Sequence, residues 1–167
     1  MIIFFLGRKY INCQEMFKNG DRSSGIRTIY PYNNTNISAK VFCDQDTDGG
    51  GWTVILRRIY GENRINFMRN WNEYSNGFGN IEKEFYAGNN LIHALTTSSK
   101  QQLRIDLADY EGNEKYAKYN FFKVDDAASN YVLNVSGFYG NAGDSLKRHN
   151  GEKFATVDKD YIGCANK

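Results

Sequence analysis

An acidic run near residue 45 is the first feature of this 167-residue chain that could bind a metal ion. Asp44, Asp46 and Asp48 alternate ahead of Gly49, as in the first half of an EF-hand calcium loop. The twelfth position of such a loop requires a bidentate glutamate, and here it is Ile55. The residues after the run also have the pattern of a strand and not of a helix. We therefore interpret the run as an acidic, solvated turn.

Three other groups of residues could support catalysis or ligand binding, and none does so convincingly. The glycines at residues 49–51 lack the lysine and hydroxyl residue of a phosphate-binding loop and precede a strand. Ser145 and Asp144 lie near His149, but no strand–turn–helix elbow accompanies them. His93 is too far from His149 in the sequence to indicate a metal site. We do not expect the chain to be an enzyme.

The composition favours one turn-rich domain that contains β-structure. A chain with 41% hydrophobic residues can bury one core, and its 16 glycines, 12 tyrosines and single proline are not typical of a helical bundle. The net charge is +2 and the basic residues are scattered, so nucleic-acid binding is not indicated. No apolar run approaches the roughly 20 residues that cross a bilayer. The apolar start, residues 1–6, is too short to prove secretion.

The three cysteines, Cys13, Cys43 and Cys164, leave two interpretations open. Three reduced thiols would fit a cytosolic protein. Alternatively, Cys13 and Cys43 enclose a suitable loop for a disulfide, and a loop of about 30 residues would be stabilised by roughly 3.5 kcal/mol. Cys164 would then be unpaired, or its partner would lie outside this sequence.

Three N-glycosylation sequons begin at Asn33, Asn36 and Asn134. The first two lie in one turn segment between Cys13 and Cys43, which fits an exposed loop of a secreted protein. Each sequon alone is weak support, because an asparagine-rich chain forms such triplets by chance. We favour glycosylation of at least one of them.

Apolar periodicity predicts short helices and strands around these residues. Helices are expected at residues 13–17, 67–74 and 91–95. Asn90 is expected to cap the last helix through its side-chain oxygen. Strands are expected at residues 25–30, 39–42, 52–56, 103–107, 116–124 and 131–135. The strand at 52–56 is apolar on both faces except for Thr53, which predicts a strand covered on each side.

The order of these motifs resembles that of the fibrinogen C-terminal (fibrinogen-like) domain family. The matching pieces run from Cys13 to Ala165, and Tyr86 stands where the family usually has tryptophan. The most specific pieces are residues 42–58 (Phe-Cys-Asp through Gly-Gly-Gly-Trp to Arg-Arg), 66–74, 77–79, 107–112 and 143–151. The resemblance covers nearly the whole chain.

The resemblance implies an α+β fold of the fibrinogen C-terminal type. Residues 1–12 would be an N-terminal tail and residues 13–167 one domain. Within it, residues 13–50 would form a small disulfide-stapled lobe, 51–137 a central, mostly antiparallel twisted sheet flanked by short helices, and 138–167 an incomplete C-terminal lobe. The resemblance pairs Cys13 with Cys43 and leaves Cys164 free.

The C-terminal part departs from the family pattern where the family binds calcium. In the family, Phe-Ser-Thr precedes three alternating aspartates and a short loop, and two of the aspartates together with loop carbonyls hold the ion. Here Phe154-Ala155-Thr156 precedes only Asp158 and Asp160, and the loop is shorter. Calcium requires six to eight oxygen ligands, so we expect a weakened site with Asp158 and Asp160 as its candidate ligands.

The family consists of extracellular recognition modules. The leading hypothesis is a secreted lectin of the ficolin and tachylectin kind that binds acetylated glycans in innate immunity, with homo-oligomers supplying avidity. The alternative is a ligand of the angiopoietin or tenascin kind that contacts a cell-surface protein or the matrix. A third hypothesis is a truncated, inactive fragment, since family members continue into the segment that holds most of the recognition pocket. The ligand-binding residues therefore stay unassigned.

Overall fold

The computed structural model describes residues 8–32, 36–61 and 64–160. The chain divides into two compact units. The first unit comprises Met1–Ile65 and Gly77–Ala87, and the second comprises Asn66–Asn76 and Gly88–Lys167. In the described part of the chain, no helix has the length and apolar character needed to span a membrane.

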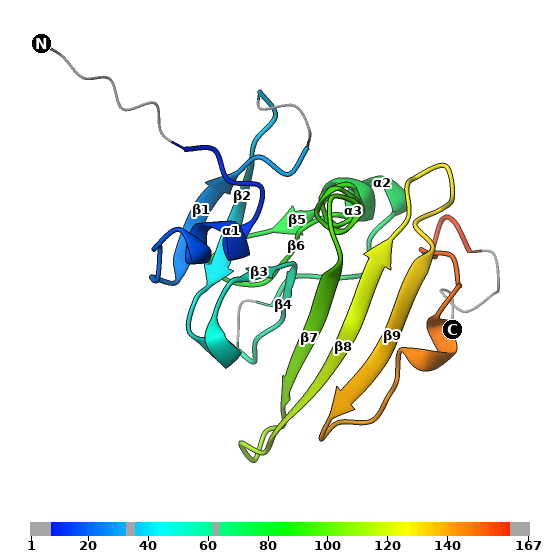
Figure 1. The fold of residues 1–167 in the computed structure, drawn as a ribbon. Coiled ribbons are helices and arrows are strands. Elements are labelled where there is room, and N and C mark those ends of the chain that lie inside the picture. Colours follow the sequence, from blue (N-terminus) through cyan, green and yellow to red (C-terminus); the bar gives the residue numbers. More distant parts are fainter. Residues whose placement is uncertain (1–7, 33–35, 62–63, 161–167) are drawn as a thin grey trace, which may run out of the picture. The chain divides into compact units, whose positions relative to one another are not determined.

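The described residues of the first unit form helix α1 and two small antiparallel sheets (Figure 1). Helix α1 (Cys13–Lys18) begins at a disulfide cysteine and buries Cys13 and Met16. The first sheet has the order β1-β2-β3, with β1 (Gly25–Ile29), β2 (Ala39–Asp44) and β3 (Trp52–Val54). A 3-10 turn, η1 (Thr47–Gly49), separates β2 from β3. The second sheet has the order β4-β6-β5, with β4 (Leu56–Arg57), β5 (Phe78–Gly79) and β6 (Phe85–Tyr86).

The second unit is built on one long antiparallel sheet of order β7-β8-β9 (Figure 1). Its strands are β7 (Gln101–Ala108), β8 (Glu114–Val124) and β9 (Leu133–Gly140). The unit also contains helices α2 (Trp71–Asn76) and α3 (Asn89–Thr97) and the 3-10 turn η2 (Lys147–His149). Ala117, Tyr119 and Val135 form the buried centre of an apolar cluster, which Leu103 and Ile105 extend along β7.

These elements confirm the expected α+β class, with antiparallel sheets and few helices. The three lobes expected within residues 13–167 stay a prediction. The two compact units follow other boundaries, because β3 pairs with β2 and residues 77–87 supply the two strands that form a sheet with β4.

The expectation that the strand at 52–56 is covered on both faces is wrong. Trp52 and Val54 are only half-buried, and Leu56 is 49% exposed. The run divides into two short strands, β3 and β4, that belong to different sheets. An apolar run therefore marked a change of sheet and not one central strand.

Two details of the helices also differ from the expectation. Helix α2 begins at Trp71, so Phe67 precedes it, and the Phe67 carbonyl accepts a hydrogen bond from the Tyr74 hydroxyl at 2.8 Å. Asn90 lies inside α3 and is not its cap, because Gly88 occupies the N-cap position with a φ of 94°. The Asn90 side-chain oxygen instead accepts a hydrogen bond from the Tyr131 hydroxyl at 2.6 Å. A contact between residues far apart in the sequence therefore determines the role of this side chain.

Candidate functional site

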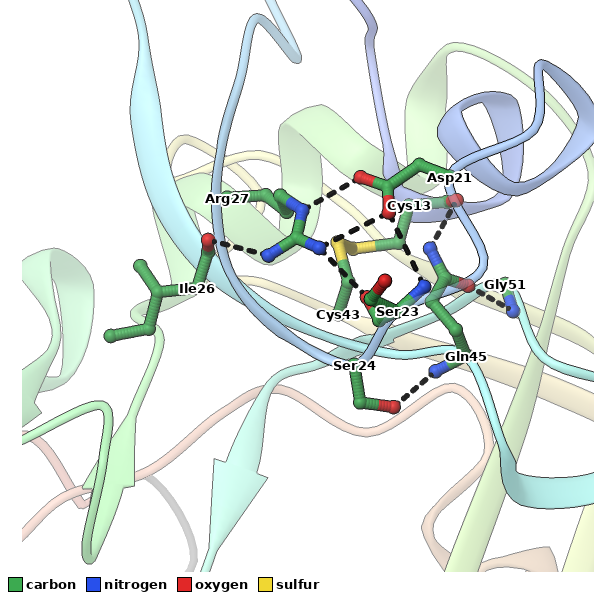
Figure 2. Close-up of polar contacts among 9 residues, drawn as sticks. All are labelled: Cys13, Asp21, Ser23, Ser24, Ile26, Arg27, Cys43, Gln45 and Gly51. Atoms are coloured by element: carbon green, nitrogen blue, oxygen red, sulfur yellow. Dashed lines mark hydrogen bonds and ion pairs between the residues drawn. A yellow bond between two sulfur atoms is a disulfide. The ribbon is translucent and has the colours of Figure 1, made fainter.

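The expected disulfide between Cys13 and Cys43 is present in the first unit (Figure 2). Both cysteines are fully buried, and their Cα atoms lie 5.4 Å apart. Gln45 is also buried, and its side chain donates to the Cys13 carbonyl at 3.3 Å and accepts from the Gly51 amide at 2.7 Å. The disulfide thus joins α1 to β2, and the Gln45 side chain joins α1 to the glycine turn. An intact disulfide is typical of proteins that mature in an oxidising compartment.

A bidentate ion pair lies beside the disulfide (Figure 2). Arg27 Nε and Nη2 donate to the two carboxylate oxygens of Asp21 at 2.7 and 3.1 Å. The hydrogen bond from Arg27 is the main reason that the pKa of Asp21 lies below its ordinary value. Arg27 Nη2 also donates to the Ser23 carbonyl at 2.9 Å. The pair therefore fixes the segment that leads from α1 into β1.

The acidic run at residues 44–48 closes a turn. Asp44 Oδ1 accepts hydrogen bonds from the amides of Asp46 and Thr47, both at 3.0 Å. Burial opposes ionisation of Asp44, but the hydrogen bonds from Thr47 and Asp46 outweigh it, so the pKa of Asp44 lies below its ordinary value. The Asp46 carboxylate accepts a hydrogen bond from the Ser24 hydroxyl. These carboxylates are thus bound to the protein's own backbone and side chains.

The first candidate calcium ligand, Asp158, lies in a tight turn of the second unit. Thr156 and Lys159 pair across this turn in an isolated antiparallel bridge. Asp158 Oδ1 accepts hydrogen bonds from the Thr156 hydroxyl at 2.7 Å and from the Trp71 amide at 2.8 Å. The Thr156 hydrogen bond is the main cause of a lowered pKa at Asp158. Asp158 therefore connects this turn to the first residue of α2.

The two candidate aspartates do not by themselves make a calcium site. The second candidate, Asp160, is half-buried and is the last described residue, so Cys164 and the loop expected to supply carbonyl ligands lie outside the described residues. Across residues 8–32, 36–61 and 64–160, no group of three or more His, Cys, Asp or Glu side chains could hold a metal ion. One Asp158 oxygen already accepts two internal hydrogen bonds. Calcium binding at Asp158 and Asp160 stays a prediction.

The surroundings of Asp158 form an aromatic cluster that the sequence did not indicate. The Trp71 ring lies 5.3 Å from the Tyr131 ring and 6.2 Å from the Phe154 ring, measured between centroids. The ammonium group of Lys159 lies 3.6 Å from the centre of the Trp71 ring, which is a cation–π contact. The cluster joins α2 to the segment that precedes β9 and to the C-terminal turn.

A local signal for the start of α2 was present in the sequence. Asn70 Oδ1 accepts from the Glu73 amide at 2.9 Å, and Glu73 Oε2 accepts from the Asn70 amide at 3.1 Å. This reciprocal pair is a capping box with asparagine as the cap. The Asn-x-x-Glu spacing at residues 70–73 would have placed the helix start correctly.

The three candidate glycosylation residues differ in their surroundings. Asn33 lies outside the described residues, and Asn36 is exposed in a turn. Asn134 is half-buried in β9, and its Nδ2 donates to Asp125 Oδ2 at 3.1 Å and to the Val132 carbonyl at 3.4 Å. A glycan is attached through this nitrogen, so modification of Asn134 would disturb both hydrogen bonds. Glycosylation at the three residues stays a prediction.

The Ser145–Asp144–His149 group has structural partners. Asp144 Oδ1 accepts hydrogen bonds from the Tyr119 hydroxyl at 2.8 Å and from the Lys147 amide at 3.2 Å. His149 Nε2 lies 3.2 Å from Arg148 Nε, which donates to it. Asp144 thus holds a turn, whereas the imidazole of His149 contacts the side chain of its neighbour Arg148. His93 is similarly placed, with Nδ1 2.9 Å from the Val124 carbonyl.

Comparison with known proteins matches residues 9–166 to the family of fibrinogen beta and gamma chains, C-terminal globular domain. Ryncolin-4 of Cerberus rynchops is 45% identical over 159 residues, and Techylectin-5A of Tachypleus tridentatus is 43% identical over 152 residues. These alignments cover 92% and 90% of this chain and 45% and 52% of the two relatives. Tenascin of Mus musculus is 44% identical over 149 residues, which are 89% of this chain and 7% of tenascin. The chain thus spans about half of the length of the first two relatives and a small part of tenascin.

Solved structures similar to this chain are also fibrinogen-like domains or fibrin. The fibrinogen-like globe domain of human ANGPTL2 superimposes with a TM-score of 0.88 at 37% identity, covering 94% of this chain and 73% of that one. Lamprey fibrin D-dimer, complexed with the peptide ligand Gly-His-Arg-Pro-amide, gives a TM-score of 0.83 at 33% identity, covering 96% of this chain and 56% of that one.

Proposed function

Because the chain belongs to the fibrinogen C-terminal domain family, we propose that it is a secreted recognition module that binds acetylated glycans. The observation that carries the proposal is the 43% identity to Techylectin-5A, whose name marks it as a lectin, over 90% of this chain. Ryncolin-4 is similar over nearly the same span.

The structure supports a binding module more than a catalyst. Asp144, which could have belonged to a nucleophilic site, is bound to the Tyr119 hydroxyl and the Lys147 amide, and the His149 imidazole accepts from Arg148. The buried disulfide fits an extracellular protein, because cytosolic reductants keep most thiols reduced. A single sugar contact is weak, so we expect homo-oligomers or clustered ligands to provide useful avidity.

A glycan array with matched sugars tests the proposal. The chain should retain N-acetylglucosamine and N-acetylgalactosamine more strongly than glucosamine and galactosamine, which differ only by the acetyl group. The array is run in millimolar calcium and again with a chelator, so that any calcium requirement is measured separately from sugar binding. Equal signals on acetylated and non-acetylated sugars, or no signal on any sugar, would reject the acetylated-glycan proposal.

The second candidate function is binding to a cell-surface or matrix protein. It is favoured by the similarity to tenascin and to the ANGPTL2 globe domain, which equals or approaches the similarity to the lectins. Saturable binding to cells that survives enzymatic removal of their glycans, together with a silent array, would favour this function. Loss of cell binding after glycan removal would favour the lectin.

A further inference from the structure

A shallow hollow on the second unit is lined by Asp144, Ser145, Lys147 and Arg148. Ser145, Lys147 and Arg148 are exposed, whereas Asp144 is half-buried. All four belong to the short segment that leads into and through η2. We refer to these four residues as the Lys147–Arg148 hollow.

The backbone of this hollow is held by the buried core. Tyr119 is only 2% exposed, and its hydroxyl both donates to Asp144 Oδ1 at 2.8 Å and accepts from the Leu146 amide at 3.3 Å. The Lys147 amide donates to the same Asp144 oxygen at 3.2 Å. A segment fixed in this way needs little further ordering when a ligand binds.

The next turn of chain is anchored as well. The His149 amide donates to the Leu146 carbonyl at 2.9 Å. Asn150 Oδ1 accepts from the Val135 amide of β9 at 2.7 Å. The segment that forms the hollow, and the turn after it, are therefore tied by hydrogen bonds to β8 and β9.

The side chains of the hollow offer donors for an anion. Among the residues that the structure describes, no hydrogen bond or ion pair engages the Lys147 ammonium or the Ser145 hydroxyl. Arg148 uses Nε for His149, which leaves the two Nη groups of its fork for another partner. The one carboxylate in the lining, Asp144, is held by Tyr119 and the Lys147 amide. Guanidinium, ammonium and hydroxyl donors together suit the oxygens of a sulfate or carboxylate group.

We propose that the Lys147–Arg148 hollow binds the anionic group of an acidic sugar, either a sulfate ester or a carboxylate. This inference rests on the proposed glycan-binding function and specifies the class of glycan. The donors are exposed, so each contact is weak and screened by salt. Binding would become strong only on a surface that presents many acidic sugars.

The test compares matched sugars in NMR titrations of the full chain. The probes are N-acetylglucosamine, N-acetylglucosamine 6-sulfate, N-acetylneuraminic acid and inorganic sulfate. The test variant is Lys147→Ala with Arg148→Ala. The matched control is Lys40→Ala with Lys100→Ala, which removes the same charge from exposed positions elsewhere.

We expect the wild-type chain and the control to bind the sulfated or the carboxylated sugar better than N-acetylglucosamine. The shifts should centre on the amides of residues 144–148. The test variant should lose about tenfold in affinity for the acidic sugar, which corresponds to about 0.7 kcal/mol for each of two exposed charge contacts. Its affinity for N-acetylglucosamine should not change. The acidic sugar that binds with the higher affinity shows whether the hollow prefers a sulfate ester or a carboxylate.

Equal loss in the test variant and the control, or equal affinity for charged and neutral sugars, would overturn the assignment. The sulfate titration separates it from the glycan proposal. If no sugar binds but sulfate shifts residues 144–148 in the wild type and not in the test variant, the glycan function fails while the anion site stands. If sulfate produces no such shift, the anion site fails whatever the sugars do.

Discussion

The first unit is built from strands of two to six residues, whereas the second contains strands of eight, eleven and eight residues. Both units bury apolar side chains, Ile29 and Val41 in the first and a cluster centred on Ala117, Tyr119 and Val135 in the second. The first unit, with its shorter strands, adds covalent and polar links to this burial, and the Cys13–Cys43 disulfide lies there. Two parts of one chain thus reach a stable fold through different interactions.

Glu84 illustrates how the first unit uses polar groups. It is 1% exposed, and its carboxylate accepts from the Ile65 amide at 2.7 Å and from the Ile59 amide at 3.1 Å. The hydrogen bond from Ile65 is the main cause of its lowered pKa. One buried carboxylate therefore satisfies two backbone amides that no strand partner serves, because both residues lie outside the strands.

From this comparison we expect loss of the disulfide to cause the largest decrease in stability, and the decrease to be confined to the first unit. Replacing Cys13 and Cys43 by alanine should lower the free energy of unfolding by roughly 3.5 kcal/mol, as expected for a loop of about 30 residues. Hydrogen exchange should accelerate in α1, β1 and β2 and change little in β7, β8 and β9. Chemical reduction of the wild-type chain should reproduce the pattern. Equal loss of protection in both units would show that they do not differ as described.

A cavity in the apolar cluster should accelerate hydrogen exchange mainly in the second unit, the opposite of the disulfide loss. Val135→Ala removes two methyl groups from a side chain that is 5% exposed, and should cost about 2 kcal/mol. Exchange should accelerate in β7, β8 and β9 before it changes in α1 or β1. Val157→Ala is the matched control, since Val157 is 37% exposed and its truncation should cost less than about 0.5 kcal/mol. A similar cost for both substitutions would contradict the importance of the cluster.

From the sequence we could predict the elements that have an apolar period, and the family from the order of its motifs. Helix α1, strand β1 and the strands of the long sheet follow apolar periods, and the family could be recognised from motifs in a fixed order. The disulfide followed from that resemblance. Asn70 and Glu73 also formed a local capping signal that apolar periodicity alone did not use.

The sequence did not reveal contacts between distant residues. Asn90 is a residue type that often caps helices, but its side chain accepts a hydrogen bond from Tyr131, 41 residues away in the sequence. Asp158 looks like a calcium ligand, yet one of its oxygens binds the Trp71 amide across 87 positions. Such pairings arise from the folded topology, so residue type and spacing do not predict them.

A smaller effect is expected at the link between the apolar cluster and the Lys147–Arg148 hollow. Tyr119→Phe keeps the ring in the core but removes the hydroxyl that binds Asp144 and the Leu146 amide. The loss should be about 1.5 kcal/mol, because the acceptor is charged and the donor is buried. Exchange of the Leu146 and Lys147 amides should rise more than that of the β8 amides. Tyr139→Phe is the control, since Tyr139 is 41% exposed in β9.

The smallest effect is expected at the Asp21–Arg27 pair of the first unit, and it should depend on pH. Asp21→Asn should cost about 0.7 kcal/mol at neutral pH, because the pair is partly exposed but bidentate. The pKa of Asp21 lies below its ordinary 3.8, mainly through the Arg27 hydrogen bond. The folded chain therefore releases this proton more readily than the unfolded chain, and the stabilisation is complete above pH 3.8. As the pH falls through the lowered folded-state pKa, Asp21 is protonated and the stabilisation disappears. In urea titrations at pH 7, 4 and 2.5, the difference between wild type and variant should thus shrink as the pH falls below 3.8. A difference of the same size at all three pH values would show that the asparagine acts through packing and not through the lost charge.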